Sequence, residues 1–155
     1  MIDSNLKNDY TATGYVINRA KSKMLLIFHK KLQKWVPPGG HLDVGELPHL
    51  GAIREVKEET GVVATIIPNG YEFGINSQDE SQLPTPYCIL HEHIPANKNV
   101  AEHMHIDFIY LLEAEENNLV FQLQEVSDAK WMTLEEINSS LTFDGLKILA
   151  KNILL

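Results

Sequence analysis

The chain has 155 residues, of which 44% are hydrophobic and 22% are charged, and this suits one globular domain over residues 1–155 with a real core. Its formal net charge of -8 argues against partners that need a basic surface, so we expect neither a nucleic acid polymer nor an anionic membrane as a partner. Cys88 is the single cysteine, which excludes an intramolecular disulfide and favours the reducing cytoplasm, and no apolar run approaches the roughly 18 residues of a membrane span.

The first half of the chain predicts two strands, a rigid loop and a helix. Residues 13–20 and 23–30 are apolar runs that indicate strands joined by a short polar turn. The segment WVPPGG, residues 35–40, predicts a rigid loop because proline fixes φ and glycine frees it. Residues 48–60 should form a helix, because the leading proline suits a first helical position and the following Gly61 suits the residue just past the end.

The second half predicts further strands and two more helices. The runs that indicate strands cover residues 62–75, 85–94, 103–114 and 128–132. Thr133 and Glu136 have the spacing of a capping box, so a short helix should begin there, and residues 143–155 should form an amphipathic helix. Strands interleaved with a few helices indicate an α/β or α+β fold with a mixed sheet.

The predicted helix over residues 48–60 carries glutamates on one side. Glu55, Glu58 and Glu59 have the spacing of one helical face, and like charges so placed repel by about a few tenths of a kcal/mol per pair. The face is therefore either solvated or occupied by a cation, and carboxylates suit Mg²⁺ or Mn²⁺. The opposite side is predicted to be a core stripe made of Leu50, Ile53, Val56 and Thr60.

The stretch from Gly40 to Val62, GHLDVGELPHLGAIREVKEETGV, resembles the Nudix box of the Nudix hydrolase superfamily. The fixed positions of that motif are filled by Gly40, Glu46, Arg54, Glu55, Val56, Glu58, Glu59, Gly61 and Val62, and the segments WVPPGG and WMTLEEI are similar to the flanks of the family. The resemblance implies a Nudix-type α/β/α sandwich around a mixed, mostly antiparallel curved sheet. One departure is Leu47, which stands where many members have a Ser or Thr that caps the helix.

The resemblance implies a metal-dependent pyrophosphohydrolase that uses Mg²⁺ or Mn²⁺. Such an enzyme cleaves a nucleoside diphosphate linked to another moiety, by water attack at phosphorus, so the expected partner is a small nucleoside diphosphate derivative. Many members are dimers, which makes a homodimer a candidate assembly. The alternative is a nucleotide-binding regulatory Nudix-fold module without turnover, but such modules usually lose acids of the motif and this chain has all of them.

The resemblance also implies roles for individual residues of the motif. Glu58 and Glu59 would bind metal directly, and Glu55 directly or through water. The carbonyl of Gly40 would join them, and these glutamates are the expected catalytic residues. Arg54 is expected to hold the loop against the helix by pairing with Glu46, although its spacing also permits a pair with Glu58.

The general base that takes a proton from the attacking water is left open by the sequence. The candidates are Glu59, Glu125 in the stretch FQLQEVSDAKW, and Glu102. Gly39 is a candidate for substrate binding, because a glycine in the loop before the helix lets backbone groups approach a phosphate closely.

Two HxH strings place histidines on both sides of one loop, at His91, His93, His103 and His105. In a hairpin centred on Lys98, His93 faces His103 and His91 faces His105, so all of them share one face. Asp107, next on that face, could then fix a tautomer of His105. The cluster would line the substrate site, bind a transition metal, or form hydrogen bonds on the sheet surface. A shift of one residue in the register would break the pairing.

Overall fold

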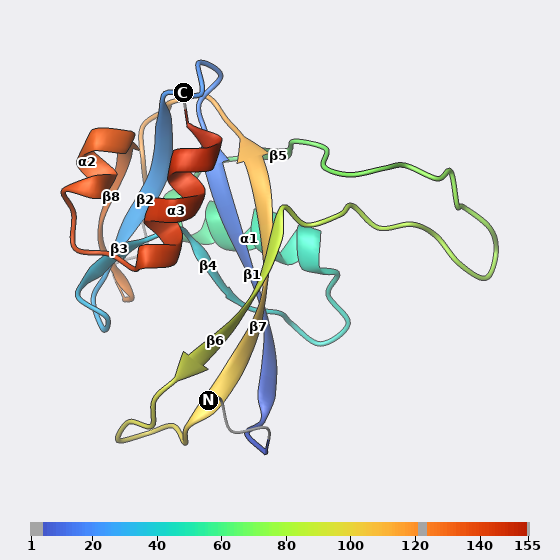
Figure 1. The fold of residues 1–155 in the computed structure, drawn as a ribbon, viewed down its shortest axis with the longest axis horizontal. Helices are drawn as coiled ribbons and strands as arrows, with labels where there is room; N and C mark the ends of the chain where they lie inside the picture. The colour runs from blue at the N-terminus through green and yellow to red at the C-terminus, as the bar shows by residue number, and fades with distance from the viewer. Residues whose placement is uncertain (1–4, 121–123, 155) are drawn as a thin grey trace.

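The computed structural model describes residues 5–120 and 124–154 (Figure 1). Its strands are β1 (Asn8–Ile17), β2 (Lys23–His29), β3 (Lys34–Val36), β4 (Gly39–His41), β5 (Thr65–Ile66), β6 (Cys88–Ile94), β7 (His103–Glu113) and β8 (Val126–Thr133). Its helices are α1 (Pro48–Thr60), α2 (Leu134–Asn138) and α3 (Asp144–Ile153). The segment predicted as a plain loop therefore contains parts of two short strands, β3 and β4, on either side of its prolines.

The strands form one mixed sheet. Across it, β3, β2, β1, β7 and β5 are neighbours in that order, while β4 pairs with β1, β6 with β7 and β8 with β2. β1 and β7 run parallel, from Asn8 beside Met104 to Ile17 beside Glu113, and the other pairings are antiparallel. This confirms the predicted mixed, mostly antiparallel sheet. The parallel pair places β1, the first strand of the chain, beside β7, which is far from it in the sequence.

Helices cover both faces of the sheet, α1 on one face and α2 with α3 on the other (Figure 1). Side chains alternate along β1, so Val16 packs in the cluster that contains α1, and Ile17 packs in the cluster that contains α3. A fully buried aliphatic side chain of this kind contributes about 1.5–3 kcal/mol. The layers confirm the predicted α/β/α sandwich.

The helix α1 has the predicted bounds and lies very close to the sheet. A Cβ atom at Gly14 of β1 would lie 2.5 Å from Cγ2 of Val56, so the glycine is what allows the helix to approach. Pro48 opens the helix, Leu47 makes no side-chain cap, and Gly61 ends it with a φ of 74°. This close contact fixes the last turns of α1, which carry the acidic residues.

The buried side of α1 is rotated relative to the predicted core stripe. Leu50 is 49% exposed, so its assignment to the core is wrong, whereas Val56 and Thr60 are buried as predicted. The other buried residues of α1 are Gly51, Ala52 and Glu59. Ala52, Val56 and Thr60 recur every four residues and Glu59 follows Val56 by three, so these residues share one helical face. The rotation leaves Glu59 only 4% exposed, so one of the predicted acidic residues lies between the helix and the sheet.

The prediction of a strand over residues 62–75 is largely wrong. Only Thr65–Ile66 forms a strand there, pairing with β7. Pro68 removes a ladder donor, and Gly70 and Gly74 have φ values of 79° and 71° that no extended strand contains. The remainder is a long excursion that projects from the sheet before β6 (Figure 1).

The C-terminal part of the fold agrees with the sequence predictions. The Thr133 hydroxyl accepts a hydrogen bond from the Glu136 N–H at 3.3 Å, and the Glu136 carboxylate accepts one from the Thr133 N–H at 2.8 Å. This is the predicted capping box at the start of α2. Within residues 5–120 and 124–154, no helix is long and apolar enough to cross a membrane.

Candidate active site

The acidic residues of α1 differ widely in exposure. The side chain of Glu58 is 51% exposed, that of Glu55 is 15% exposed, and Glu59 as a residue is 4% exposed. The helix therefore presents carboxylates that run from solvent to the junction with the sheet. Only part of this face is solvated, which argues against a plain surface role for the group.

Glu59 is held at this junction by the backbone of the proline–glycine loop. Its Oε1 accepts a hydrogen bond from the Gly39 N–H at 3.1 Å. Burial, followed by the negative charge of Glu55 and a hydrogen bond with it, raises the pKa of Glu59 well above its ordinary value. Without a cation, burial and the charge of Glu55 therefore favour the protonated form of Glu59.

Gly40 brings the backbone of β4 against the second carboxylate. A Cβ atom at Gly40 would lie 2.7 Å from Oε1 of Glu55, which is too close for an undisturbed contact. The absence of a side chain thus lets the main chain lie beside the carboxylate. β4 and α1 therefore bring together oxygen atoms that could bind a metal, from the backbone of Gly40 and from the carboxylates of the helix.

Arg54 connects the loop to the acidic helix. Its guanidinium donates to Glu46 at 2.7 and 2.8 Å, to Glu55 at 2.9 Å and to Glu58 at 3.1 Å, and also to the His41 carbonyl at 3.1 Å. Both predicted pairings of Arg54 are therefore present at once. The hydrogen bonds from Arg54 lower the pKa of Glu46, so this pair is ionised at neutral pH.

Two further candidates for the general base have different surroundings. The charge of Glu125 contributes to the raised pKa of Glu59, which places the Glu125 carboxylate near the buried end of the acidic face. Glu125 precedes β8, and its carbonyl accepts from the Lys30 N–H at 2.9 Å. Glu102 instead pairs with His93 at 2.6 Å on the hairpin of β6 and β7. The structure thus favours Glu125 over Glu102 as a neighbour of Glu59.

The predicted register of the histidine hairpin is wrong by one residue. Glu92 lies opposite His105 and Ile94 lies opposite His103, so His91 and His93 point to the other face of the sheet. The turn is closed by a hydrogen bond from the Asn97 N–H to the Val100 carbonyl, which moves its centre half a residue beyond Lys98. No contact tests substrate binding by these histidines, so that role stays a prediction.

His91 and His93 find partners on their own face. His91 Nε2 lies 2.8 Å from Asn8 Oδ1, and His93 pairs with Glu102 as described above. The expected role of Asp107 is also wrong, because no hydrogen bond joins Asp107 to His105 within the described part of the chain. Asp107 is 4% exposed and accepts hydrogen bonds from the hydroxyls of Thr11 and Thr13 at 2.8–2.9 Å.

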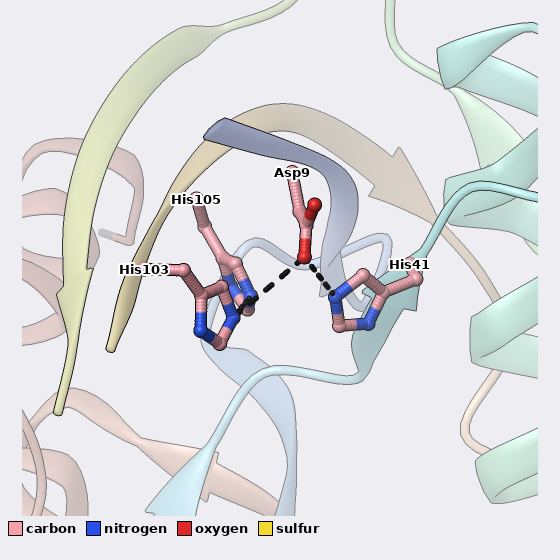
Figure 2. Close-up of side chains that lie close together, drawn as sticks. All are labelled: Asp9, His41, His103 and His105. Carbon is pink, nitrogen blue, oxygen red and sulfur yellow. Dashed lines mark hydrogen bonds and ion pairs between the residues drawn. The ribbon is translucent and has the colours of Figure 1, made fainter. Parts of the chain in front are cut away.

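His103 and His105 stay on one face of β7 and are joined there by Asp9 of β1 and His41 of β4 (Figure 2). His103 Nε2 lies 3.1 Å from His105 Nε2, and Asp9 Oδ2 lies 3.5 Å from His41 Nε2 and 3.8 Å from His103 Nε2. Sequence reasoning missed Asp9 and His41. Asp9 comes beside His105 through the parallel pairing of β1 with β7, and His41 comes opposite Thr11 through the pairing of β4 with β1, so only these long-range pairings could have indicated them.

Within this second cluster, His105 has little tendency to carry charge. Burial, followed by the nearby imidazoles of His41 and His103, lowers the pKa of His105 to about 4. His105 is therefore neutral at physiological pH and offers a lone pair on one ring nitrogen. The His41 and His105 rings meet edge to face with centroids 4.9 Å apart.

A family model described as the NUDIX domain matches residues 9–151. A protein of Lactococcus lactis subsp. cremoris (strain MG1363) with the name Probable DHNTP pyrophosphohydrolase is 35% identical over 116 residues, which is 70% of this chain and 60% of the relative. The chain thus spans 60% or less of the curated relatives it matches.

Solved structures agree with this match. A hydrolase of the NUDIX family from Clostridium perfringens has a TM-score of 0.76 at 27% identity, covering 96% of this chain and 97% of that one. The dihydroneopterin triphosphate pyrophosphohydrolase of E. coli has a TM-score of 0.64 at 13% identity, covering 94% of each chain, and this likeness supports the fold alone. The family match over most of the chain, together with the acidic helix packed on the mixed sheet, shows that the chain belongs to the Nudix hydrolase family.

Proposed function

We propose that this protein is a divalent-metal-dependent pyrophosphohydrolase that cleaves a small nucleoside diphosphate derivative by water attack at phosphorus. The observation that carries the proposal is the set of carboxylates from Glu55, Glu58 and Glu59 gathered against the backbone of Gly39 and Gly40. A set of hard oxygen donors suits Mg²⁺ or Mn²⁺ rather than softer ions. Residues 1–155 would act as a single domain in this reaction.

Glu55, Glu58, Glu59 and the Gly40 carbonyl are the groups that we propose to hold the metal. The closeness of the Gly40 backbone to the Glu55 carboxylate supports this set, because a side chain at Gly40 would occupy the space between them. The raised pKa of Glu59 also fits, since a bound cation would stabilise the carboxylate charge that burial disfavours. When bound, Mg²⁺ or Mn²⁺ would neutralise phosphate oxygens and lower the pKa of the attacking water.

The residues of the chain itself would position the substrate and move the proton. Arg54 fixes the loop through Glu46, which keeps the Gly39 N–H and its neighbours aimed at the site. A carboxylate must accept the proton from water, and Glu59 and Glu125 are the candidates at the buried end of the face. A Glu125→Gln variant distinguishes the two candidates, because kcat should fall by orders of magnitude if Glu125 is the base and change only slightly if Glu59 is the base.

The printed name of the Lactococcus relative makes dihydroneopterin triphosphate the first substrate to test. A panel should also contain nucleoside triphosphates, ADP-ribose, nucleotide sugars, dinucleoside polyphosphates and coenzyme A. Each compound is incubated with Mg²⁺ or Mn²⁺, and phosphate is measured after coupling to a phosphatase. We expect turnover of at least one compound. The rate should rise toward alkaline pH because the attacking water must lose a proton.

Variants connect the measured activity to the acidic helix. Glu58→Gln and Glu59→Gln should each lower turnover by at least about a hundredfold, as expected for loss of a preorganised electrostatic element. Glu135→Gln, which changes an exposed acid on α2, is the matched control and should keep wild-type turnover. Tight nucleotide binding without turnover in the wild-type protein would instead favour a regulatory module of the same fold.

The setting of the protein is also part of the proposal. Cys88 is the single cysteine of the chain, which suits a reducing compartment such as the cytoplasm. A homodimer stays a prediction, which light scattering of the purified protein would test.

A further inference from the structure

We propose that Asp9, His41, His103 and His105 form a binding site for a transition-metal ion of the zinc type, separate from the carboxylates of α1. Each of these residues offers one ligand atom, and these atoms all lie within 4.8 Å of one another (Figure 2). The site goes beyond the proposed hydrolysis, because it uses different side chains and a different kind of ion.

The spacing of the ligand atoms fits a tetrahedral ion. Zinc lies about 2.0–2.1 Å from histidine nitrogens, so two ligands of a tetrahedron are about 3.3 Å apart. The two closest imidazole nitrogens, of His103 and His105, are 3.1 Å apart. Asp9 Oδ2 lies 3.5 Å from His41 Nε2 and 3.8 Å from His103 Nε2. An ion could therefore enter after small side-chain rotations.

The orientation of His103 is already that of a ligand. Its Nδ1 lies 2.8 Å from the Ala101 carbonyl, and a carbonyl can only accept, so Nδ1 carries the hydrogen. The neutral ring then has its lone pair on Nε2, which is the atom that faces the cluster. Zinc-bound histidines are held in the same way by a hydrogen bond from the other ring nitrogen. His103 is 7% exposed, so this orientation is fixed by packing.

The other ligands come from paired strands rather than from loops. Asp9 of β1 lies beside His105 of β7, and His41 of β4 lies opposite Thr11 of β1. Ligands on neighbouring strands keep their spacing better than ligands on loops. Lys7 pairs with Asp9 Oδ1 at 2.7 Å and leaves Oδ2 turned toward the imidazoles.

The two sites lie on opposite faces of β4 and differ in chemistry. A Cβ atom at Gly40 would point toward Glu55, so the side chain of the next residue, His41, points to the opposite face, where it meets His105. Three imidazoles with one carboxylate suit zinc and related ions, whereas the carboxylates of α1 suit Mg²⁺. An ion here would tie together β1, β4 and β7 beside the loop that carries Gly39 and Gly40.

In the alternative case no ion binds, and a hydrogen bond between His103 Nε2 and His105 Nε2 holds the two imidazoles together. Cobalt distinguishes the two cases, because four-coordinate Co²⁺ with such ligands absorbs visible light intensely. Untagged protein is freed of metal with a chelator and titrated with Co²⁺, and Zn²⁺ is titrated in parallel by calorimetry. The wild-type protein should show a stoichiometric four-coordinate Co²⁺ spectrum that Zn²⁺ displaces.

Variants assign the signal to the cluster. His41→Ala changes a side chain that is 60% exposed, so the fold is not at risk, and it should weaken Zn²⁺ binding by more than about a hundredfold. His103→Ala should do the same. His91→Ala and His93→Ala change histidines on the other face and should leave binding unchanged. Glu59→Gln should lose turnover but keep the Co²⁺ spectrum, which separates this proposal from the proposed hydrolysis.

Thermal unfolding gives a second readout that does not depend on activity. Zn²⁺ should raise the Tm of the wild-type protein and leave that of His41→Ala unchanged, because an ion that binds only the folded state stabilises it. Absence of the four-coordinate spectrum in the wild-type protein would overturn the proposal. Equal binding by wild-type and His41→Ala proteins, or loss of binding on changing His91, would overturn it as well.

Discussion

Replacing Glu59 by glutamine is expected to stabilise the metal-free protein while it removes catalysis. Glu59 is 4% exposed and accepts the Gly39 N–H at 3.1 Å, a bond that the glutamine oxygen would keep. Burial first, and then the charge of Glu55, raise the pKa of Glu59. At neutral pH the folded protein must therefore either hold a proton on Glu59 or bury a second charge. Glutamine avoids both costs.

The size of the gain follows from proton linkage. A carboxyl group with an ordinary pKa of 4.5 costs about 1.4 kcal/mol per pH unit to keep protonated above that pH. Over the interval to about pH 7 this sets a ceiling near 3 kcal/mol, so we expect Glu59→Gln to gain about 1–3 kcal/mol. Because the pKa of Glu59 is raised, the penalty is absent below the unfolded pKa and grows as pH rises. The gain should therefore vanish near pH 4 and be large near pH 8.

The assay is urea unfolding in the presence of a chelator, at several pH values across this range. Glu58→Gln is the matched control, because Glu58 is 51% exposed and pairs with Arg54 at 3.1 Å. Its removal should change the free energy of unfolding by no more than about 0.5 kcal/mol, and in the destabilising direction. A Glu59→Gln protein no more stable than wild type near pH 8 would refute the reasoning, and so would an equal gain from Glu58→Gln.

Three further substitutions test the site and the fold. Gly40→Ala should lower kcat at least about tenfold, because the new Cβ would lie 2.7 Å from the Glu55 carboxylate and displace it. Gly145→Ala is the control and should keep wild-type kcat in the same steady-state assay, because its new Cβ would meet no atom within 4 Å. Arg54→Lys should cost about 1–2 kcal/mol in urea unfolding, because lysine cannot donate two parallel hydrogen bonds to the loop carboxylate; unchanged stability would count against that clamp. Thr133→Ala should cost about 1 kcal/mol through loss of the α2 cap and leave kcat/KM unchanged, and a fall in kcat/KM would contradict a purely structural role.

The helix and its motif could be predicted from sequence because their signals are local. Pro48 and Gly61 mark the ends of α1 through their own backbone preferences, and the structure has the same bounds. The buried face was harder to predict, because it depends on how the helix is rotated against the sheet. The contact of Val56 with Gly14 sets that rotation, and the spacing of apolar residues within the helix alone wrongly placed Leu50 in the core.

The histidines show why side-chain clusters across strands are hard to predict. Moving the turn centre by half a residue, through the bond between Asn97 and Val100, put His91 and His93 on the other face. The partners that replaced them come from distant parts of the chain. Asp9 reaches His105 only through the parallel pairing of β1 with β7, and nothing in the local sequence around either residue indicates that pairing.

The most direct test of the central claim is pyrophosphate release from dihydroneopterin triphosphate by chelator-treated protein before and after Mg²⁺ is returned. We expect no turnover in excess chelator and full recovery with Mg²⁺, and we expect this recovery to be lost in Glu59→Gln. If this compound is not cleaved, the same test applies to whichever compound of the panel is turned over. Full turnover in excess chelator, or Mg²⁺-dependent turnover that survives Glu59→Gln unchanged, would contradict the role assigned to the acidic helix.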